Sequence, residues 1–362
     1  MAIWQSAMES LDIMSFWLDK RVLITGHTGF KGSWLTLALL ESGAHISGFA
    51  LEAEQVSLFN QLSTTGKIDS CIGDIRDKKK LTESIAKVQP DIIFHLAAQP
   101  LVLASYENPY ETFDVNLMGT ASLLEAAFDA GFLGTIVMVT SDKVYENDNR
   151  GCRFDENDRL GGGDPYSASK AASEFIIKSY GETIFSKNDK IKLVSARSGN
   201  VIGGGDWASN RIVPDIIRSI ETKEVLEVRS PNSTRPWMHV LDSINGYLKL
   251  AAHISSSGKF GYNGSYNFGP NTGSYSVENI LEELSKYFEV NWVAKDTFKG
   301  SQEAIELGLN SKKARDRLGW EPSLQFSRAV ECTAQWYLSY LSGGSMDEIT
   351  RKQIATYLGG SK

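Results

Sequence analysis

Two short segments of the chain concentrate side chains that can transfer protons. Ser141, Asp142 and Lys143 follow directly after the apolar run TIVMVT, and the later segment DPYSASKAASE places Tyr166 and Lys170 four positions apart. A serine or a carboxylate in a loop usually forms only a turn or a helix cap. Here five capable side chains come from two segments, one after a predicted strand and one opening a predicted helix, and this pattern predicts an assembled catalytic site.

Tyr166 and Lys170 lie one turn apart on the same face of the predicted helix. A lysine ammonium group favours the phenolate and lowers a phenol pKa from its ordinary value near ~10 toward working pH. The tyrosine can then take a proton from a substrate alcohol while hydride leaves the adjacent carbon. Because the YxxxK spacing also occurs by chance on exposed helix faces, this interpretation depends on a cofactor site elsewhere in the chain.

A glycine-rich turn supplies that cofactor site. In VLITGHTGFKGSWL, three glycines follow a predicted strand and open a predicted helix. Glycines let the backbone approach a pyrophosphate closely, and the helix N terminus offers free N–H groups and a positive dipole end. Such turns also occur for packing reasons, but GDIRD and HLAAQP further along support dinucleotide binding. The predicted cofactor-binding residues are Gly26, His27, Thr28, Gly29, Phe30, Lys31, Gly32, Asp74, Ile75, Leu96, Ala97, Ala98, Tyr166 and Lys170.

The segment beyond the glycines favours NAD over NADP. A carboxylate for the ribose 2′-hydroxyl is expected ~20 residues further on, where the chain reads FALEAE and offers Glu52. No arginine lies in that segment to bind a 2′-phosphate. We expect Asp74 to hold the adenine amino group, and His27 and Lys31 to offer phosphate donors.

Apolar, β-rich runs alternate with helical patterns through the first half of the chain. The predicted strands are 21–25, 45–50, 91–97, 135–140 and 192–197, with a further strand before Asp74. The helical segments WLTLALLESG and NLMGTASLLEAAFDAG each end on a glycine suited to a C-cap. This alternation predicts an α/β fold with a Rossmann-type doubly wound parallel sheet that is covered on both faces.

The regular alternation fades after about Gly199. Beyond it we expect a helix near 213–220, a strand near 225–228, and helices near 277–288 and 327–340. The predicted division is 1–198, mainly a NAD-binding Rossmann domain, and 199–362, mainly a smaller substrate-binding α/β lobe over the carboxyl edge of the sheet. Some exchange of chain between the two lobes is expected.

Composition argues against several classes of protein. A chain of 362 residues with 42% hydrophobic and 22% charged residues is typical of a soluble globular protein. Its net charge of −7 without like-charge blocks favours neither nucleic acid nor a membrane surface as partner. Three cysteines, Cys71, Cys152 and Cys332, without a CxxC pair argue against disulfides and zinc, and favour the cytoplasm. The N-terminal stretch does not resemble a signal peptide, and we expect no bound metal and no membrane span.

Together these motifs resemble the extended branch of the short-chain dehydrogenase/reductase superfamily, over roughly Phe16 to Tyr340. GHTGFKGSW, HLAAQPLV, TSDKVYEN, RSGNVIGGGDWA and RPWMHV are similar, in combination, to the CDP-glucose 4,6-dehydratases among the nucleotide-sugar enzymes of that branch. The C-terminal LNSKKARDRLGWEPSL extends the likeness. The resemblance implies NAD as cofactor, CDP-glucose as substrate, and a lyase reaction with an internal redox cycle.

The resemblance also implies roles for the proton-transferring residues. Ser141, Tyr166 and Lys170 match the hydride-transfer triad, and Asp142 and Lys143 match two further proton-handling positions, where the TDP-glucose enzymes have Asp-Glu. Oxidation at C4 acidifies the proton at C5, whose removal expels the C6 hydroxyl before hydride returns to C6. Asp142 is interpreted as the acid and Lys143 as the base. Exchanged roles, or an ordinary salt bridge between the two, are alternatives.

Nucleotide-sugar binding is expected mainly in the C-terminal half. For Arg235 the resemblance implies a diphosphate contact, which suits a guanidinium group. Trp237 fits the core as well as a stacking platform, and His239 fits a structural role as well as a substrate contact. The predicted substrate-binding residues are Gln99, Asn200, Arg211, Arg235 and His239.

Two other functions and an assembly state follow from the same patterns. A C4 epimerase, or a dehydratase for another nucleotide sugar, would share most of these motifs, whereas a non-catalytic nucleotide sensor predicts a broken triad. The segments LMGTASLLEAAF and YSASKAASEFIIKSY are richer in apolar and small residues than one buried helix face requires. They predict a helical bundle between subunits, in a homodimer or a tetramer.

Overall fold

The computed structural model describes residues 15–359, except for 65, 148–150, 152, 188–189, 271–272, 274 and 296–307. Cys152 and the stretch before Ser15, both considered in the sequence analysis, lie outside the described residues. Cys71 and Cys332 are free thiols. No helix within the described ranges is long and apolar enough to cross a membrane.

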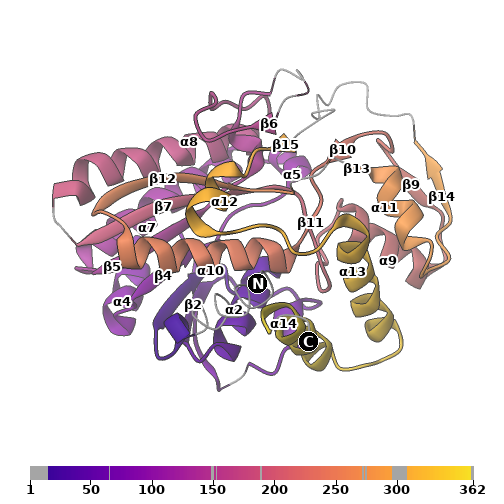
Figure 1. The fold of residues 1–362 in the computed structure, drawn as a ribbon, viewed down its shortest axis with the longest axis horizontal. Helices are drawn as coiled ribbons and strands as arrows, with labels where there is room; N and C mark the ends of the chain where they lie inside the picture. Colours follow the sequence, from indigo (N-terminus) through magenta and orange to yellow (C-terminus); the bar gives the residue numbers. More distant parts are fainter. Residues whose placement is uncertain are drawn as a thin grey trace.

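Seven parallel strands form the central sheet (Figure 1). They lie in the order β12-β7-β5-β4-β1-β2-β3, and all neighbours pair in parallel. The order reverses beside β1, which marks the topological switch point of a doubly wound sheet. The predicted Rossmann-type fold is confirmed. The strands are β1 (Arg21–Thr25), β2 (His45–Ala50), β3 (Ile68–Ile72), β4 (Ile92–His95), β5 (Gly134–Val139), β7 (Ile191–Ser198) and β12 (Gly261–Phe268).

Helices cover both faces of the sheet because its inner strands are apolar on both sides. Along β1, Val22 and Ile24 pack into one core cluster and Leu23 into the other, as the alternation of side chains along a strand requires. One cluster includes α2 and α10, and the other includes α4, α7 and α8. Figure 1 shows α8 and α10 on opposite sides of the sheet. The bounds are α2 (Phe30–Glu41), α4 (Lys78–Val88), α7 (Gly119–Asp129), α8 (Pro165–Ser179) and α10 (Val240–Ser257).

Shorter elements complete the layers around the sheet. Four helices are α3 (Leu58–Gln61), α5 (Val102–Glu107), α6 (Pro109–Phe113) and α12 (Lys312–Leu318). Wider or tighter turns extend other helices at η1 (Asp114–Met118), η3 (Tyr180–Ile184) and η4 (Phe185–Lys187), and η2 (Asp142–Val144) is a single 3₁₀ turn after β5. The strand pair β6 (Arg153–Phe154) and β15 (Gly308–Leu309) joins segments that are far apart in the sequence.

The less regular C-terminal half contributes a second group of elements, on the right in Figure 1. Its helices are α9 (Ile212–Thr222), α11 (Val277–Leu284), α13 (Phe326–Leu341) and α14 (Met346–Leu358). Three short strand pairs are β8 (Val201–Ile202) with β11 (Met238–His239), β9 (Leu226–Val228) with β14 (Trp292–Ala294), and β10 (Thr234–Arg235) with β13 (Tyr275–Ser276). The same half also supplies α10 and the edge strand β12 to the sheet layers.

The sequence patterns located part of these elements, and α4, α12 and α14 were among those not predicted. The predicted helices near 213–220 and 327–340 correspond to α9 and α13, and the strand near 225–228 to β9. The helix predicted near 277–288 ends earlier, at Leu284. α10 and β12 were not predicted.

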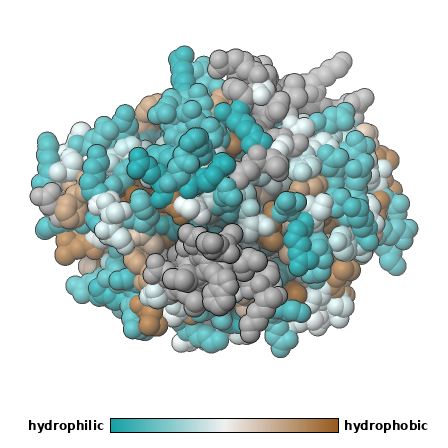
Figure 2. All heavy atoms as spheres, in the orientation of Figure 1, coloured by the Kyte–Doolittle hydropathy of each residue, from teal (hydrophilic) through white to brown (hydrophobic). Residues whose placement is uncertain are grey.

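On the face drawn in Figure 2, hydrophilic side chains predominate and apolar ones form small separate groups.

Candidate active site

The two proton-transferring segments meet at the carboxyl edge of the sheet. Ser141 follows β5 and is the N-cap of the η2 turn, where its Oγ accepts from the Lys143 N–H at 3.2 Å. Asp164 caps α8 by accepting from the Ser167 N–H at 2.9 Å, and Pro165 occupies the first helical position. Tyr166 therefore lies in the first turn of α8, with its backbone N–H bonded to Ser105 Oγ at 3.2 Å.

All three triad side chains are buried. Their exposed fractions are 6% for Ser141, 8% for Tyr166 and 7% for Lys170. Burial raises the pKa of Tyr166 to about 12, although a hydrogen bond with Ser141 and the charge of Arg211 act in the opposite direction. Burial lowers the pKa of Lys170 to about 8; nearby Lys31 acts in the same direction and Glu174 opposes it. The expected lowering of the Tyr166 pKa by a neighbouring lysine is therefore wrong for this structure, in which burial raises that pKa.

Asp142 is placed as a buried, protonatable acid. It is 2% exposed, and its Oδ1 accepts from Ser141 Oγ at 3.1 Å. Its Oδ2 has no hydrogen-bond partner and faces Gly199, where an added Cβ would lie 3.2 Å away. Burial raises the pKa of Asp142, although the positive charges of Lys143, Arg235 and Lys31 oppose the shift. A carboxyl group held this way retains a proton that an exposed aspartate would lose.

The three glycines of the first turn have different surroundings. Gly26 has φ +76°, and a Cβ there would lie 2.7 Å from the Ala97 backbone nitrogen. A Cβ on Gly32 would lie 2.1 Å from the Gly26 carbonyl oxygen. Gly29 is the N-cap of α2, makes no side-chain cap, and would place a Cβ no closer than 3.4 Å to that oxygen. Gly26 and Gly32 are therefore needed for packing, whereas Gly29 leaves space open at an uncapped helix N terminus.

The side chains around this turn divide between structural and exposed roles. His27 is fully buried, and its Nε2 shares a hydrogen bond with Ser70 Oγ at 2.7 Å. Its ring lies where a Cβ on Gly48 would be. Burial lowers the pKa of His27 to about 4. Its imidazole thus points into the sheet layer, and only its backbone belongs to the turn. Thr28 Oγ1 donates to Leu51 O at 3.0 Å. The half-buried Phe30 packs at the edge of the core cluster beneath α2.

Lys31 points toward the centre of the site. Its Nζ lies 3.4 Å from Tyr247 OH and within electrostatic reach of both Asp142 and Lys170. A lysine in the glycine turn is thereby brought close to Asp142 and Lys170, although strands β2 to β5 lie between them in the sequence. The arrangement links the predicted cofactor turn to the predicted catalytic group.

The predicted adenine end is held by a charge cluster. Asp74, just after β3, binds Arg76 through both carboxylate oxygens, at 2.9 and 2.6 Å. Arg76 also donates to Glu111 and Asp114, at 2.9 and 2.8 Å. The Arg76 hydrogen bond lowers the pKa of Asp74, which keeps this carboxylate charged and able to accept a further donor. Ile75 beside it is buried, and only a glycine fits opposite it at position 119.

The residues after β4, Leu96 to Gln99, form a turn held by hydrogen bonds. Leu96 N–H donates to Thr25 O at 3.0 Å, and Ala97 N–H to Thr25 Oγ1 at 3.4 Å, while Ala98 continues the half-buried turn. The Gln99 side chain is used locally: its Nε2 donates to Leu101 O and Thr112 Oγ1, at 3.1 and 2.8 Å. Gln99 therefore shapes this turn in the structure.

Two of the predicted substrate-binding residues lie next to the catalytic side chains. Arg235 in β10 is 4% exposed and close enough to Asp142 to oppose the rise of its pKa. Arg211, at the N-cap of α9, pairs with Asp206 at 2.9 Å and acts by charge on Tyr166. Asn200 accepts from the Met238 N–H at 3.0 Å through its backbone oxygen.

Two other C-terminal residues have clear structural contacts. His239 is fully buried, caps α10 by accepting from the Leu241 N–H at 3.2 Å, and has its pKa lowered to about 3 by burial. Its Nε2 has no partner. Trp237 is 7% exposed, belongs to the larger core cluster, and donates to Tyr275 O at 2.9 Å.

Sequence reasoning missed three polar residues that support the site. His95, at the end of β4, is buried beside Lys170 and shares a 2.8 Å hydrogen bond with Thr25 Oγ1. Asn116 donates to Ser169 Oγ at 2.9 Å and accepts from the Gln99 N–H at 2.8 Å. Glu174 is 2% exposed on α8. Only Glu174 had a usable signal, because it repeats the four-residue spacing of Tyr166 and Lys170 along one helix face.

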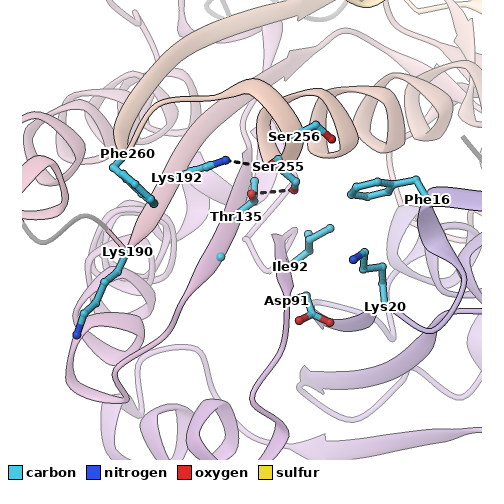
Figure 3. Close-up of a pocket in the computed structure, with 11 residues that line it drawn as sticks. Phe16, Lys20, Asp91, Ile92, Thr135, Lys190, Lys192, Ser255, Ser256 and Phe260 are labelled. Atoms are coloured by element: carbon cyan, nitrogen blue, oxygen red, sulfur yellow. Dashed lines mark hydrogen bonds between the residues drawn. The ribbon is translucent and has the colours of Figure 1, made fainter.

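A cavity of about 500 Å³ lies at the opposite, amino edge of the sheet (Figure 3). Its walls include Phe16, Lys20 and Phe260, and its lysine Lys192 donates to Ser255 O, in the last turn of α10, at 2.6 Å. Ligands of doubly wound sheets bind at the carboxyl ends of the strands. This cavity is therefore separate from the candidate active site. In the part of the chain that the structure describes, no group of three or more metal-ligating side chains could hold a metal ion.

Comparisons with known proteins place the chain among nucleotide-sugar enzymes. The family model described as GDP-mannose 4,6 dehydratase matches residues 23–333. A CDP-glucose 4,6-dehydratase of Salmonella typhimurium is 40% identical, over 95% of this chain and 98% of its own length. A UDP-glucose 4-epimerase of Rhizobium meliloti is 25% identical, over 90% and 99%.

Solved structures share the fold. An epimerase from Methanothermobacter thermautotrophicus aligns with a TM-score of 0.78 and 25% identity, covering 95% of this chain and 97% of its own. A dTDP-glucose 4,6-dehydratase from Streptomyces venezuelae aligns with a TM-score of 0.73 and 23% identity, covering 90% and 98%. Since the family model covers most of the chain and the Salmonella relative matches nearly all of it, this chain belongs to the GDP-mannose 4,6 dehydratase family of nucleotide-sugar enzymes.

Proposed function

We propose that the protein dehydrates CDP-D-glucose to CDP-4-dehydro-6-deoxy-D-glucose with NAD as cofactor. It is thus a hydro-lyase of nucleotide-sugar metabolism. The Salmonella relative, matched end to end at 40% identity, bears the name CDP-glucose 4,6-dehydratase. A structural observation supports the proposal in addition to the sequence similarity. Asp142 is buried, and its raised pKa and its Oδ2 without a hydrogen-bond partner suit a proton donor beside Ser141, Tyr166 and Lys170. Simple C4 epimerisation requires no such acid.

The residues of the glycine turn fit NAD. Gly29 leaves space open at the uncapped N terminus of α2, where a pyrophosphate is stabilised by backbone N–H groups and the helix dipole. Asp74 lies where the adenine amino group is expected, and Ile75, Leu96, Ala97 and Ala98 complete the predicted walls. NAD held there would supply a group that can take up and give back a hydride.

The chain's own residues then divide the proton transfers. Tyr166 takes the proton of the C4 hydroxyl, with Ser141 hydrogen-bonded to it and Lys170 one turn along the same face of α8. We propose that Lys143, in its neutral amine form, removes the proton at C5 and returns a proton there when hydride reaches C6. Asp142, whose pKa is raised by burial, is proposed to donate a proton to the departing C6 hydroxyl. The roles of Asp142 and Lys143 are a proposal that rests on the family resemblance and on the burial of Asp142, and each role can be tested by substitution.

The substrate is proposed to lie between the carboxyl edge and the C-terminal half. Arg235 is proposed to bind the diphosphate, and Arg211 lies close enough to Tyr166 to contact the sugar or its phosphate. Gln99, Asn200 and His239 stay as proposed contacts, through backbone or side chain. The division at about residue 198 into a cofactor lobe and a substrate lobe, with α10 and β12 crossing back to the sheet, is part of the same proposal.

We further propose a homodimer in the cytoplasm. Large apolar side chains remain exposed on the helices expected to form the subunit contact: Met118 is 51% and Phe175 60% exposed. Their burial against a second copy would remove the kind of patch that marks an interface. The free thiols of Cys71 and Cys332 are consistent with a reducing compartment.

A substrate panel tests the function. Purified protein with NAD is incubated with CDP-glucose and, in parallel, with TDP-, UDP- and GDP-glucose, and products are followed by mass spectrometry. Loss of one water from CDP-glucose, without net NADH, is expected. Net NADH would indicate an ordinary dehydrogenase, and a sugar of unchanged mass but altered configuration at C4 would indicate an epimerase.

A further inference from the structure

The segment that carries Ser141, Asp142 and Lys143 is attached at both ends to one buried ion pair. Thr140, directly before it, donates through Oγ1 to Glu174 Oε1 at 2.5 Å. Tyr145, directly after the η2 turn, accepts at its hydroxyl from Arg197 Nη1 at 2.8 Å. Arg197 Nη2 in turn donates to Glu174 Oε2 at 2.8 Å. A single connected network therefore spans the catalytic segment from one end to the other.

The ion pair joins three elements that the site requires. Glu174 belongs to α8, one turn beyond Lys170 and two turns beyond Tyr166, and Arg197 belongs to β7. Ser195, also on β7, donates to Glu174 Oε2 at 2.9 Å. The carboxylate thus connects the helix that carries the tyrosine and lysine with the strand next to β5 and with the turn that carries the serine.

Tyr145 is held from a second side as well. Its hydroxyl donates to Asn267 Oδ1, on β12, at 2.7 Å, and its ring stacks on Phe154 with centroids 5.0 Å apart. The hydroxyl therefore uses both its acceptor and its donor capacity. Its position is defined by β7 and β12 together, so the end of the catalytic segment has little freedom to shift.

Both charged groups are almost fully buried, with exposed fractions of 2% for Glu174 and 3% for Arg197. Removing such charges from water is costly, and an apolar pair of similar volume is often equally stable. A contribution to folding stability therefore explains this buried ion pair poorly. A role in positioning reacting groups explains it better, because a displacement of a reacting group by about 1 Å can reduce a rate ~100-fold.

We propose that the Glu174–Arg197 ion pair positions the Ser141–Val144 segment against Tyr166 and Lys170, by fixing Thr140 at one end and Tyr145 at the other. Glu174, Arg197, Thr140 and Tyr145 are positioning residues and act on the reaction only through this segment. The inference rests on the proposed dehydratase function for its kinetic consequences. Its structural content, a segment held by the ion pair, stands independently of the substrate.

Conservative variants of the two attachment points test the proposal. Replacing Glu174 or Arg197 would leave the partner as an unpaired buried charge and can prevent folding, so we choose Thr140→Val and Tyr145→Phe. The controls are Thr333→Val, whose hydroxyl bonds to Ala329 O in its own helix, and Tyr180→Phe. Tyr180 is the C-cap of α8, and its hydroxyl donates to Glu125 on α7. Each control removes one hydroxyl hydrogen bond outside the network, as Thr140→Val does within it, whereas Tyr145→Phe removes two.

Steady-state kinetics with CDP-glucose separate positioning from general stability. The two network variants should lose about tenfold or more in kcat with KM changed by less than about threefold, because substrate binding is retained while the reacting groups are displaced. The controls should keep wild-type kcat even if their melting temperatures fall equally. Wild-type kcat in both network variants would overturn the proposal, as would an equal loss of kcat in the controls.

Hydrogen exchange gives a readout that does not depend on the substrate. Backbone amides of residues 141–146 should exchange faster in Thr140→Val and in Tyr145→Phe than in the wild type and the controls, with exchange in β1 and β4 unchanged. If the wild-type protein shows no dehydratase activity, the proposed function fails and exchange alone decides the inference. Unchanged exchange in 141–146 would then overturn it.

Discussion

Asp142→Asn is the substitution that most sharply separates the parts of the proposed mechanism. The two side chains have nearly the same shape, and an asparagine oxygen can still accept the 3.1 Å hydrogen bond from Ser141. The amide takes the place of the unpartnered Oδ2 but has no proton to give to a leaving hydroxyl. General acid catalysis contributes about 10²- to 10⁴-fold to a rate. We therefore expect kcat for water loss to fall by that factor, equivalent to about 3 to 5 kcal/mol.

The same substitution has a predictable effect on stability. Burial raises the pKa of Asp142 in the folded protein above the ordinary value of 3.8, so the folded state holds a proton that the unfolded state releases. Wild-type stability therefore falls as pH rises from 3.8 through the folded-state pKa. Asparagine does not titrate and avoids this loss. Asp142→Asn should consequently be at least as stable as wild type near pH 7, and its advantage should shrink in acid.

Asp242→Asn is the matched control. Asp242, on α10, is also fully buried, and burial raises its pKa to about 6. Its carboxylate accepts from Tyr357 OH and from the Ser323 N–H. This control should show the same sign of stability change with pH and retain its kcat. Melting curves between pH 4 and 8 and mass-spectrometric assay of water loss measure both effects. Wild-type turnover by Asp142→Asn would refute the acid assignment, and a twofold effect or less would leave Asp142 only a structural role.

Three further predictions concern the cofactor turn, the triad and the subunit contact. Gly29→Ala should fold normally yet weaken NAD binding by about tenfold or more in calorimetry, since its Cβ enters the space left for a pyrophosphate; Gly32→Ala, whose Cβ would lie 2.1 Å from a carbonyl oxygen, should instead impair folding. An unchanged NAD affinity in Gly29→Ala would contradict the site. Lys170→Met should abolish turnover. It should also be more stable than wild type below pH ~8, and this gain should fade toward pH ~10.5, because the buried lysine then becomes neutral in both the folded and the unfolded state. A gain in stability that does not depend on pH would argue against the lowered pKa of Lys170. Phe175→Glu should convert the dimer to monomer in light scattering, and an unchanged mass would exclude α8 from the interface.

The fold was predictable where the sheet is buried on both faces. The inner strands β1, β4 and β5 are short apolar runs bounded by turns, and such runs are typical of parallel strands under helices. β12 was missed because GYNGSYNF is polar and contains glycines. It lies at the edge of the sheet with β7 as its partner and is irregular between Tyr262 and Ser265, so it needs neither an apolar pattern nor a regular one.

The local geometry of the candidate site was predictable where its parts are close in sequence. The spacing of Tyr166 and Lys170, and the run from Ser141 to Lys143, each fix a local geometry that the structure has. The direction of the His27 ring was not predictable, because it depends on Gly48 and Ser70 in two neighbouring strands. Long-range pairings of this kind leave no periodic or local pattern in the sequence.

Intramolecular return of hydride is the central claim, and isotopic labelling tests it most directly. CDP-glucose carrying deuterium at C4 would be incubated with the protein and NAD, and the product analysed by mass spectrometry and NMR. The account predicts a product that has lost one water and carries the deuterium at C6. Deuterium retained at C4 with no loss of water would identify an epimerase, and deuterium accumulating in free NADH would identify a simple dehydrogenase; either result would contradict the proposed function.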